Sequence, residues 1–395
     1  MKLLIYSHFF APSVGGVETA VLSLARGLAE RRDSGGQPEF EITLVTQTSA
    51  GQFDDLALPF RVFRAPGLLR LWRLICASDA IHLAGPSLLP LFLGWIARTP
   101  AAIEHHGYQA VCPNGLLIHK PDGAVCPGHF LRRHYGECAK CLAHESAAPR
   151  NWIRLFSMLP RYLLSRRAAV NLAISNYTLH RCGLPRSSVI YYGIEDPCRN
   201  AVPGQQPKRS EGKVSFAYVG RLVAEKGIPI LLEAARLLQA EGYSFEVRLI
   251  GDGPERSNLE ATIARGNLEP CVRITGFLVG DALSEALRDV SAVVMPSVWE
   301  ETAGLSAIEQ MMRGGLVIAS DIGGLGEIVG EGGLKFPAGN AQALAATMRA
   351  VLREPSTIIS LRKAARARAL SLFLRERMID DHARVYRQLI LPANE

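Results

Sequence analysis

The sequence predicts an α/β protein with two doubly wound, Rossmann-like domains that face a central cleft. Two observations carry this prediction. The chain has 395 residues, which exceeds the size at which one hydrophobic core keeps growing, so two domains are expected. Short runs rich in Val, Ile and Leu alternate with helical patterns through most of the chain, which is typical of parallel sheets covered by helices on both faces.

The expected strands divide into two groups. In the first domain, residues 1–200, they are the apolar runs at 2–7, 41–47, 80–85, 101–106, 169–175 and 188–193. In the second domain, residues 214–370, they are the runs at 214–220, 245–251, 271–277, 291–297, 316–320 and 333–336. Helical patterns such as 228–242 and 281–290 lie between them.

A polar segment separates the two groups. Residues 195–213 contain prolines at 197, 203 and 207 and show no apolar periodicity, so the linker is predicted at 201–213. The last segment, 371–395, is predicted to be a helix that could pack back on the first domain.

Composition limits the partners. The formal charge of +7 and the pI near 9.0 favour an anionic partner. There is no long basic block and only 7% of residues are aromatic, so no nucleic-acid partner is expected. The N-terminus has no signal-peptide pattern, and no apolar run approaches the roughly 20 residues that span a bilayer. A cytoplasmic protein is therefore expected.

Each half opens with a strand that enters a special loop. Gly15 and Gly16 follow the first strand, where a ligand or simply another backbone could approach closely. In the second half, "GRLVAEKG" places Arg221 after Gly220, and Lys226 just before the next helix. This pair of cations can hold a diphosphate, and surface solvation of the same pair is the alternative.

The stretch "SVWEETAGLSAIEQMMRGG" follows the strand at 291–297. Residues 302–305 are predicted to form a helix N-terminus, whose N–H groups attract phosphate. Glu309 would lie about 7 Å along that helix from Gly304, within reach of a ribose, and Glu301 would face the far side of the phosphate. A capping acid with a solvated helix glutamate is the alternative.

Read in order, "GRLVAEKG", "LIGDGPE", "VRITGF" and "MPSVWEETAGLSAIEQMMRGGLVIASDIGGLGEIV" resemble the C-terminal domain of glycosyltransferase family 4, also described as glycosyl transferases group 1. These are retaining enzymes of the GT-B fold that use nucleotide sugars. The resemblance covers nearly all of residues 214–340 and includes the family's two glutamates, here Glu301 and Glu309. The first half resembles the family through "HFFAPSVGGVE", "EHHG", "AISNYTLHRCG" and "VIYYGIE".

The resemblance implies a role for each motif. Arg221 and Lys226 would bind the donor diphosphate and Glu309 the ribose, while Glu301 and the backbone of residues 303–305 would hold the transferred sugar and its phosphate. His106 would lie near the anomeric carbon. The implied catalytic residues are His106, Glu301, Arg221 and Lys226, and the implied donor-binding residues are Gly16, Gly220, Arg221, Lys226, Gly276, Glu301, Thr302, Ala303, Gly304, Leu305 and Glu309.

The implied donor is a UDP-, GDP- or ADP-linked sugar, and the acceptor is a hydroxyl of a glycan, a lipid-linked molecule or a small molecule. Transfer would need no cofactor. The family commonly has Pro and Phe after its first glutamate, where this chain has Thr302 and Ala303, and Asn where this chain has Tyr192. These departures bear on which sugar the site accepts.

Cysteines gather between residues 112 and 141. Cys112, Cys126, Cys138 and Cys141 are half of the chain's eight cysteines, and the last two form a C-x-x-C motif. Without an export signal, disulfides are not expected. The four thiols suit a structural zinc ion or an iron–sulfur centre, and a metal-free loop with reduced thiols is the alternative.

Residues 151–168, "NWIRLFSMLPRYLLSRRA", mix large apolar side chains with arginines. Such a helix could contact an anionic membrane at the inner membrane face, or it could be an ordinary amphipathic helix packed in the first domain.

Two other functions remain open. One is a catalytically inactive nucleotide-sugar-binding or partner subunit of the same fold. The other is a nicotinamide-dependent Rossmann enzyme, which is disfavoured because neither half contains G-x-G-x-x-G.

Overall fold

The computed structural model of the chain describes residues 1–13, 15–144, 150–199 and 214–390. It contains two compact units, one made of Met1–Ile194 with Leu374–Glu395 and the other of Glu195–Phe373. The sequence placed the domain boundaries at residues 200 and 370 instead. The predicted linker at 201–213 lies outside the described residues.

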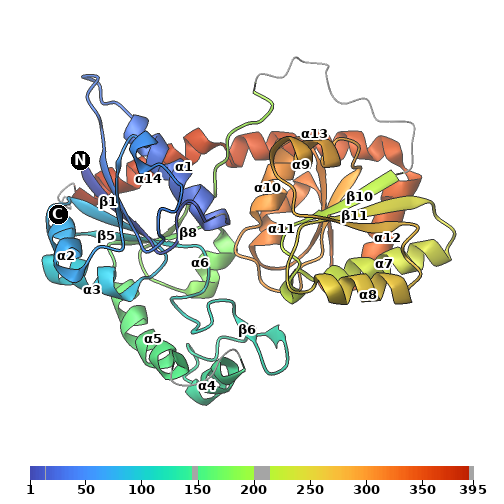
Figure 1. The fold of residues 1–395 in the computed structure, drawn as a ribbon, viewed down its shortest axis with the longest axis horizontal. Coiled ribbons are helices and arrows are strands. Elements are labelled where there is room, and N and C mark those ends of the chain that lie inside the picture. The colour runs from blue at the N-terminus through green and yellow to red at the C-terminus, as the bar shows by residue number, and fades with distance from the viewer. Residues whose placement is uncertain (14, 145–149, 200–213, 391–395) are drawn as a thin grey trace. The chain divides into compact units, whose positions relative to one another are not determined.

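The first unit is built on a seven-stranded parallel sheet with the strand order β3-β2-β1-β4-β5-β8-β9 (Figure 1). Its strands read as near-continuous apolar runs because helices cover both faces. Along β1, Leu3 and Ile5 pack into one core while Leu4 and Tyr6 pack into another. The strands are β1 (Lys2–Ser7), β2 (Glu41–Thr46), β3 (Arg61–Arg64), β4 (Ala80–Ala84), β5 (Ala101–His105), β8 (Val170–Ala173) and β9 (Ser187–Val189).

Two sets of helices cover this sheet. Helices α1 (Gly16–Glu30) and α14 (Arg375–Ile390) bury their apolar side chains in the core that contains Leu3 and Ile5. Helices α2 (Leu68–Cys76), α3 (Leu88–Ala97) and α5 (Arg150–Arg167) contribute to the core that contains Leu4 and Tyr6. The predicted C-terminal helix is α14, and it lies within the first unit.

The cysteine-rich segment follows β5. It contains a short antiparallel hairpin of β6 (Ile118–His119) and β7 (Ala124–Val125), followed by α4 (Tyr135–Ala143). Helix α6 (Asn176–Cys182) then connects β8 to β9, and Ser175 caps it by accepting a hydrogen bond from the Thr178 N–H. A short 3-10 helix, η1 (Asp55–Ala57), precedes β3.

The second unit has a six-stranded parallel sheet with the order β12-β11-β10-β13-β14-β15. Its strands are β10 (Val214–Val219), β11 (Phe245–Ile250), β12 (Val272–Gly276), β13 (Ala292–Met295), β14 (Leu316–Ser320) and β15 (Leu334–Phe336). Its helical elements are η2 (Ala224–Lys226), α7 (Ile228–Ala240), α8 (Arg256–Arg265), α9 (Gly280–Leu287), α10 (Leu305–Met312), α11 (Gly323–Val329), η3 (Gly330–Gly332), α12 (Ala341–Arg353) and α13 (Pro355–Leu372).

The predicted fold class, α/β with two parallel Rossmann-like sheets, is confirmed. All the predicted strands belong to the two sheets. Sequence reasoning missed β3 because its four residues, "RVFR", include two arginines and only two apolar side chains. It also missed the hairpin of β6 and β7, whose strands have two residues each.

Three glycines hold the ends of β10, β11 and β12 together. The Gly251 N–H donates to the Gly276 carbonyl at 2.9 Å, and the Gly220 N–H donates to the Ile250 carbonyl at 3.0 Å. A Cβ atom on Gly251 would lie 1.9 Å from the Gly220 carbonyl oxygen. The contact between these backbones therefore requires glycine at position 251.

We expect Gly251→Ala to destabilise the second unit more than Gly242→Ala. Both glycines have positive φ, 149° and 82°, but nothing lies within 4 Å of a Cβ on Gly242. Gly242→Ala should cost about 1 kcal/mol of unfolding free energy for its backbone conformation, and Gly251→Ala about 2 kcal/mol more for the overlap. Urea unfolding followed by circular dichroism measures both, and equal losses would contradict this role of Gly251.

Candidate active site

The candidate site of the second unit lies at the carboxyl end of its central strands. Strands β10 and β13 are parallel neighbours, so the loops that follow them lie at the same edge of the sheet. Arg221 follows β10 and is exposed, and the buried Tyr218 hydroxyl donates to the Arg221 carbonyl at 2.7 Å. Residues 296–304 follow β13.

A lysine and a glutamate join these two loops. The Nζ atom of Lys226 lies 2.9 Å from Oε1 of Glu301, whose side chain is only 5% exposed. The Ser297 hydroxyl donates to the same carboxylate oxygen, and the Lys226 ammonium lies 5.9 Å from the centre of the Trp299 ring. The two residues that the sequence predicted to share the donor site are therefore in direct contact.

The backbone brings Lys226 to this position. Gly227 adopts φ 64°, and a Cβ there would lie 2.1 Å from the Pro296 carbonyl oxygen. The Val298 N–H donates to the Glu225 carbonyl at 3.1 Å. Because only glycine permits so close an approach, the turn after η2 can pack directly on the loop after β13.

Glu301 is fixed by its backbone as well as by its side chain. Its carbonyl accepts a hydrogen bond of 2.5 Å from the Gly324 N–H, which holds the start of α11 against the loop. A Cβ on Gly304 would lie 3.9 Å from Oε2 of Glu301, so the carboxylate is close to the N-terminus of α10. This arrangement fixes the carboxylate before any ligand binds.

The helix after this loop begins later than the sequence predicted. Thr302 and Ala303 precede the helix in a buried loop, Gly304 is the N-cap with φ 101°, and Leu305 is the first helical residue. The left-handed conformation of Gly304 turns the chain into the helix, so the helix cannot start at Thr302. The first N–H groups of α10 have no intrahelical acceptor, whereas those of Ala307 and Ile308 donate to the Gly304 carbonyl.

Glu309 lies on α10 and is half-buried. Burial raises the pKa of its carboxyl group, and the nearby Arg313 opposes that effect. The neighbouring residues Ile308 and Gln310 are buried. A carboxylate that has lost water in this way gains by accepting hydrogen bonds from a ligand hydroxyl.

The other predicted residues are placed as follows. Gly220 and Gly276 lie at the strand ends described above. Gly16 and His106 belong to the first unit, where Gly16 is the exposed first residue of α1 and His106 follows β5.

His106 is held between a tyrosine and a glutamate. Its Nδ1 atom lies 2.6 Å from the Tyr192 hydroxyl, and the two rings stack with centroids 5.6 Å apart. Its Nε2 atom lies 3.4 Å from Oε2 of Glu104. Burial lowers the pKa of His106, while Glu104 opposes that effect, so the ring is neutral at pH 7. Tyr192, which replaces the asparagine of the family pattern, thus supports His106.

Sequence reasoning missed several residues that support the site. Ser297 and Trp299 lie inside the stretch that contains Glu301, and Glu104 precedes the two histidines of "EHHG". Their proximity in the chain to predicted residues was a usable signal. Tyr192 was noted only as a departure from the family's asparagine, and Tyr218 gave no signal because it lies in an apolar strand-like run where a tyrosine fits the core.

Among the described residues, the four cysteines of the predicted metal site do not belong to a group of three ligand atoms within 4.8 Å of one another. Cys112, Cys126, Cys138 and Cys141 are buried and free. Burial and the neighbouring Cys112, Cys126 and Cys141 raise the pKa of Cys138 to about 12. In the described part of the chain, the group whose three ligand atoms lie within 4.8 Å of one another is a different one, in the first unit.

The sequence is similar to that of known glycosyltransferases. Residues 204–369 match the family model described as "Glycosyl transferases group 1". The 2-deoxystreptamine glucosyltransferase of Streptomyces kanamyceticus is 35% identical over 158 residues, which are 40% of this chain and 41% of that relative. The 2-deoxystreptamine N-acetyl-D-glucosaminyltransferase of Streptomyces fradiae is 29% identical over 364 residues, 84% of this chain and 81% of that relative.

A solved structure matches nearly the whole chain. The Anabaena protein HepE, crystallised in complex with UDP, has a TM-score of 0.73 at 18% identity, covering 98% of this chain and 100% of that one. At this identity the match concerns the fold, and it gives each unit the architecture of a GT-B domain.

A test concerns the histidine beside His106. His105 is buried, its Nε2 atom lies 2.9 Å from Oδ1 of Asn171, and burial lowers its pKa to about 4. Between pH 6.5 and pH 4 the unfolded chain therefore binds a proton that the folded state does not bind. The stability of the first unit should fall as the pH drops through this window.

His105→Gln keeps an amide donor near Asn171 and removes the titrating group. We expect the dependence of unfolding free energy on pH between 6.5 and 4 to become shallower by up to about 1.4 kcal/mol per pH unit. His82 and His106, whose pKa values are also lowered, retain their part of the slope. Urea titrations at several pH values measure it, and an unchanged slope would contradict the assignment.

Proposed function

We propose, from the support that these matches give to the group 1 glycosyltransferase family, that this protein transfers a sugar from a nucleotide sugar to an acceptor hydroxyl. The observation that carries the proposal is the contact of Lys226 with Glu301 at the carboxyl edge of a doubly wound sheet. That contact puts a cation, a fixed carboxylate and the N-terminus of α10 in one place.

The donor diphosphate would bind to Arg221, Lys226 and the N–H groups at the start of α10. When the bond from the anomeric carbon to the diphosphate breaks, negative charge grows on the leaving oxygen. Positioned cations and N–H groups stabilise that charge more than they stabilise the bound donor, and this lowers the barrier. A guanidinium can fork onto two phosphate oxygens, while the ammonium acts as a point charge.

Glu309 and Glu301 would divide the recognition of the two sugars. The half-buried Glu309 carboxylate accepts hydrogen bonds from the ribose hydroxyls. Glu301, held by Ser297 and Lys226, accepts hydrogen bonds from the transferred sugar. Lys226 would then leave Oε1 of Glu301 in part to meet the diphosphate, so donor binding rearranges an existing ion pair.

We further propose that transfer retains the configuration at the anomeric carbon, as in family 4. In this reading the neutral His106 contributes a hydrogen bond to the sugar, and Glu104 and Tyr192 hold its ring. The bond from the anomeric carbon to the diphosphate breaks, the acceptor oxygen bonds to that carbon, and the acceptor's proton passes to an oxygen of the leaving nucleoside diphosphate. The acceptors to screen are 2-deoxystreptamine, which the names of two relatives contain, and glycan or lipid-linked molecules, with UDP-, GDP- and ADP-sugars as donors.

Lys226→Ala and Glu309→Gln should each lower transfer by about 10²-fold or more, because each removes a group that binds the donor through the transition state. Lys363→Ala, on an exposed position of α13, is the matched control and should retain activity. Turnover of labelled nucleotide sugars measures transfer. Melting temperatures with UDP, GDP and ADP separately measure binding.

The outcomes separate the candidates. Binding of a nucleoside diphosphate without transfer or hydrolysis of any donor would favour the inactive binding subunit. Stabilisation by NAD instead would favour the nicotinamide enzyme.

We propose that the cysteine-rich segment has a structural role in ordering the chain after β5. The Asn114 amide donates to Sγ of Cys141 at 3.1 Å, and the Lys120 N–H donates to the same sulfur at 3.4 Å. Zinc or an iron–sulfur centre at these cysteines stays a prediction, and elemental analysis tests it.

We also propose that helices α2, α3 and α5 contact an anionic membrane, where a lipid-linked acceptor would reside. The three helices cover one face of the first unit's sheet and contact one another in the order α2, α3, α5. Their exposed large apolar side chains are Leu68, Leu69, Leu89, Phe92, Trp95, Ile96, Trp152, Ile153, Phe156, Leu159 and Leu163. An exposed apolar surface of this extent is typical of an interaction site.

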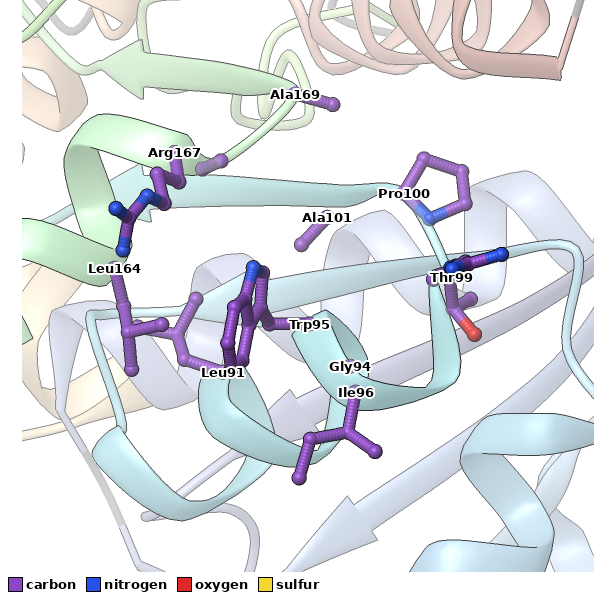
Figure 2. A pocket seen from close by; sticks show the side chains of 12 residues that line it. Leu91, Gly94, Trp95, Ile96, Thr99, Pro100, Ala101, Leu164, Arg167 and Ala169 are labelled. Carbon is purple, nitrogen blue, oxygen red and sulfur yellow. The ribbon is translucent and has the colours of Figure 1, made fainter.

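The charge of this surface favours anionic lipid. Helices α2 and α5 contain arginines, Arg98 follows the end of α3, and none of the three helices contains Asp or Glu. A pocket of about 580 Å³ lies between α3 and the end of α5. Figure 2 shows Leu91, Trp95 and Leu164 among its lining residues, near Arg167. Apolar side chains beside a guanidinium suit an acyl chain and its phosphate. No helix in the described ranges is long and apolar enough to cross a membrane, and we propose peripheral attachment at the cytoplasmic face.

The paired variant Trp152→Ser with Phe156→Ser should reduce binding to vesicles that contain anionic lipid by roughly tenfold or more. The two rings are exposed and stack 5.9 Å apart on α5. Ile359→Ser, at an exposed apolar position of α13, is the control and should bind like the unmodified protein. Co-sedimentation with vesicles measures binding, and equal sedimentation of both variants would contradict the proposed surface.

A further inference from the structure

A carboxylate and two histidines meet in the core of the first unit. His82 lies on β4, Glu104 on the neighbouring β5 and His382 on α14. His82 and His382 are fully buried, and Glu104 is 3% exposed. One ligand atom from each residue lies within 4.8 Å of the other two.

The spacing of these atoms does not fit hydrogen bonds. Nε2 of His82 lies 3.4 Å from Oε2 of Glu104, and Nε2 of His382 lies 3.5 Å from Oε1. Charge-assisted N–H···O bonds are about 2.7 to 2.9 Å long, and neither Nε2 atom has a hydrogen-bond partner in the described part of the chain. Two ligands bound at about 2.1 Å to one tetrahedral ion lie roughly 3.4 Å apart.

The proton positions support the same reading. Nδ1 of His382 lies 2.8 Å from the Met378 carbonyl oxygen, which can only accept, so Nδ1 carries the proton. A neutral His382 ring then directs the lone pair of Nε2 at a carboxylate. That contact is repulsive unless a cation lies between the two groups or the ring takes up a second proton.

The surrounding groups suit a metal ligand set. Nδ1 of His82 lies 2.8 Å from the Tyr386 hydroxyl, so each ring is oriented through its second nitrogen, as metal-bound histidines usually are. Burial lowers the pKa of His82. Burial alone would raise the pKa of Glu104, but the surrounding histidines bring it well below its ordinary value. A neutral imidazole and an ionised carboxylate are the forms that bind metal.

We propose that His82, Glu104 and His382 bind a divalent transition-metal ion, with zinc as the first candidate. The ion would tie α14 to β4 and β5, whose ligands are distant in sequence, and would fix the carboxylate that also contacts His106. We assign the ion a structural role because its ligands are buried. It would act on His106 only indirectly, by holding the Glu104 carboxylate that His106 contacts. The inference does not depend on the proposed glycosyl transfer.

The test uses the full-length chain without a histidine tag, in a variant with Cys112, Cys126, Cys138 and Cys141 changed to Ser. After dialysis against zinc and then against buffer, elemental analysis should find one equivalent of zinc, and chelation should lower the melting temperature. His382→Gln in the same background should abolish retention of the ion. Retention by both proteins, or by neither, would overturn the proposal.

A second measurement protects the test against misfolded variants. Co²⁺ added to the unmodified apo-protein should give weak visible d–d bands of a nitrogen and oxygen site. A strong near-ultraviolet sulfur-to-cobalt charge-transfer band at one equivalent of Co²⁺ would assign the ion to the cysteines and overturn the proposal. Absence of any cobalt spectrum would leave His382 as an imidazolium paired with Glu104 and overturn it equally.

Discussion

The parallel pairing of β10 with β13 is the constraint on which the candidate site depends. Because both strands run the same way and are neighbours, the loops that follow them leave the sheet at one edge. The turn at Gly227 can then pack on the Pro296 carbonyl, and Lys226 can reach Glu301 across the two loops. The other proposed donor contacts in the second unit come from the loops that follow β10 and β13 and from α10, which follows the second of these loops.

The pair has a cost as well as a use. The Glu301 carboxylate is almost fully buried, so it has lost most of its hydration, and Lys226 and Ser297 replace part of it. Removing the lysine would leave a buried charge with one fewer partner. A bound diphosphate would instead attract Lys226 while the hydroxyls of the sugar replaced it at Glu301. In the empty site the ion pair of Lys226 with Glu301 compensates the buried carboxylate. On donor binding, both groups would exchange this contact for contacts with the donor.

Local pattern and motif order were sufficient to predict the two sheets and to assign Lys226 and Glu301 to one predicted donor site, because strand ends and turn glycines are local features of the chain. The direct contact of the two residues comes from the structure. Pattern and motif order were not sufficient for Tyr192 or for the start of α10. Tyr192 supports His106 from 86 residues away, and no local pattern encodes such a pairing. The helix starts at Leu305 because Gly304 turns into the left-handed region, a choice that a Thr-Ala-Gly sequence leaves open.

The same limit explains why sequence reasoning did not find the histidine and carboxylate group of the first unit. Cysteines attract attention because a C-x-x-C motif is visible in the sequence, yet their sulfurs are not brought together as a ligand set in the described residues. His82, Glu104 and His382 have no common spacing, and only the return of α14 to the sheet of the first unit unites them. Met378 and Tyr386 of α14 pack into the core of that unit. The same packing brings His382 to His82 and Glu104. Because His382 joins His82 and Glu104 only when α14 packs on the sheet, the sequence pattern alone does not reveal this group.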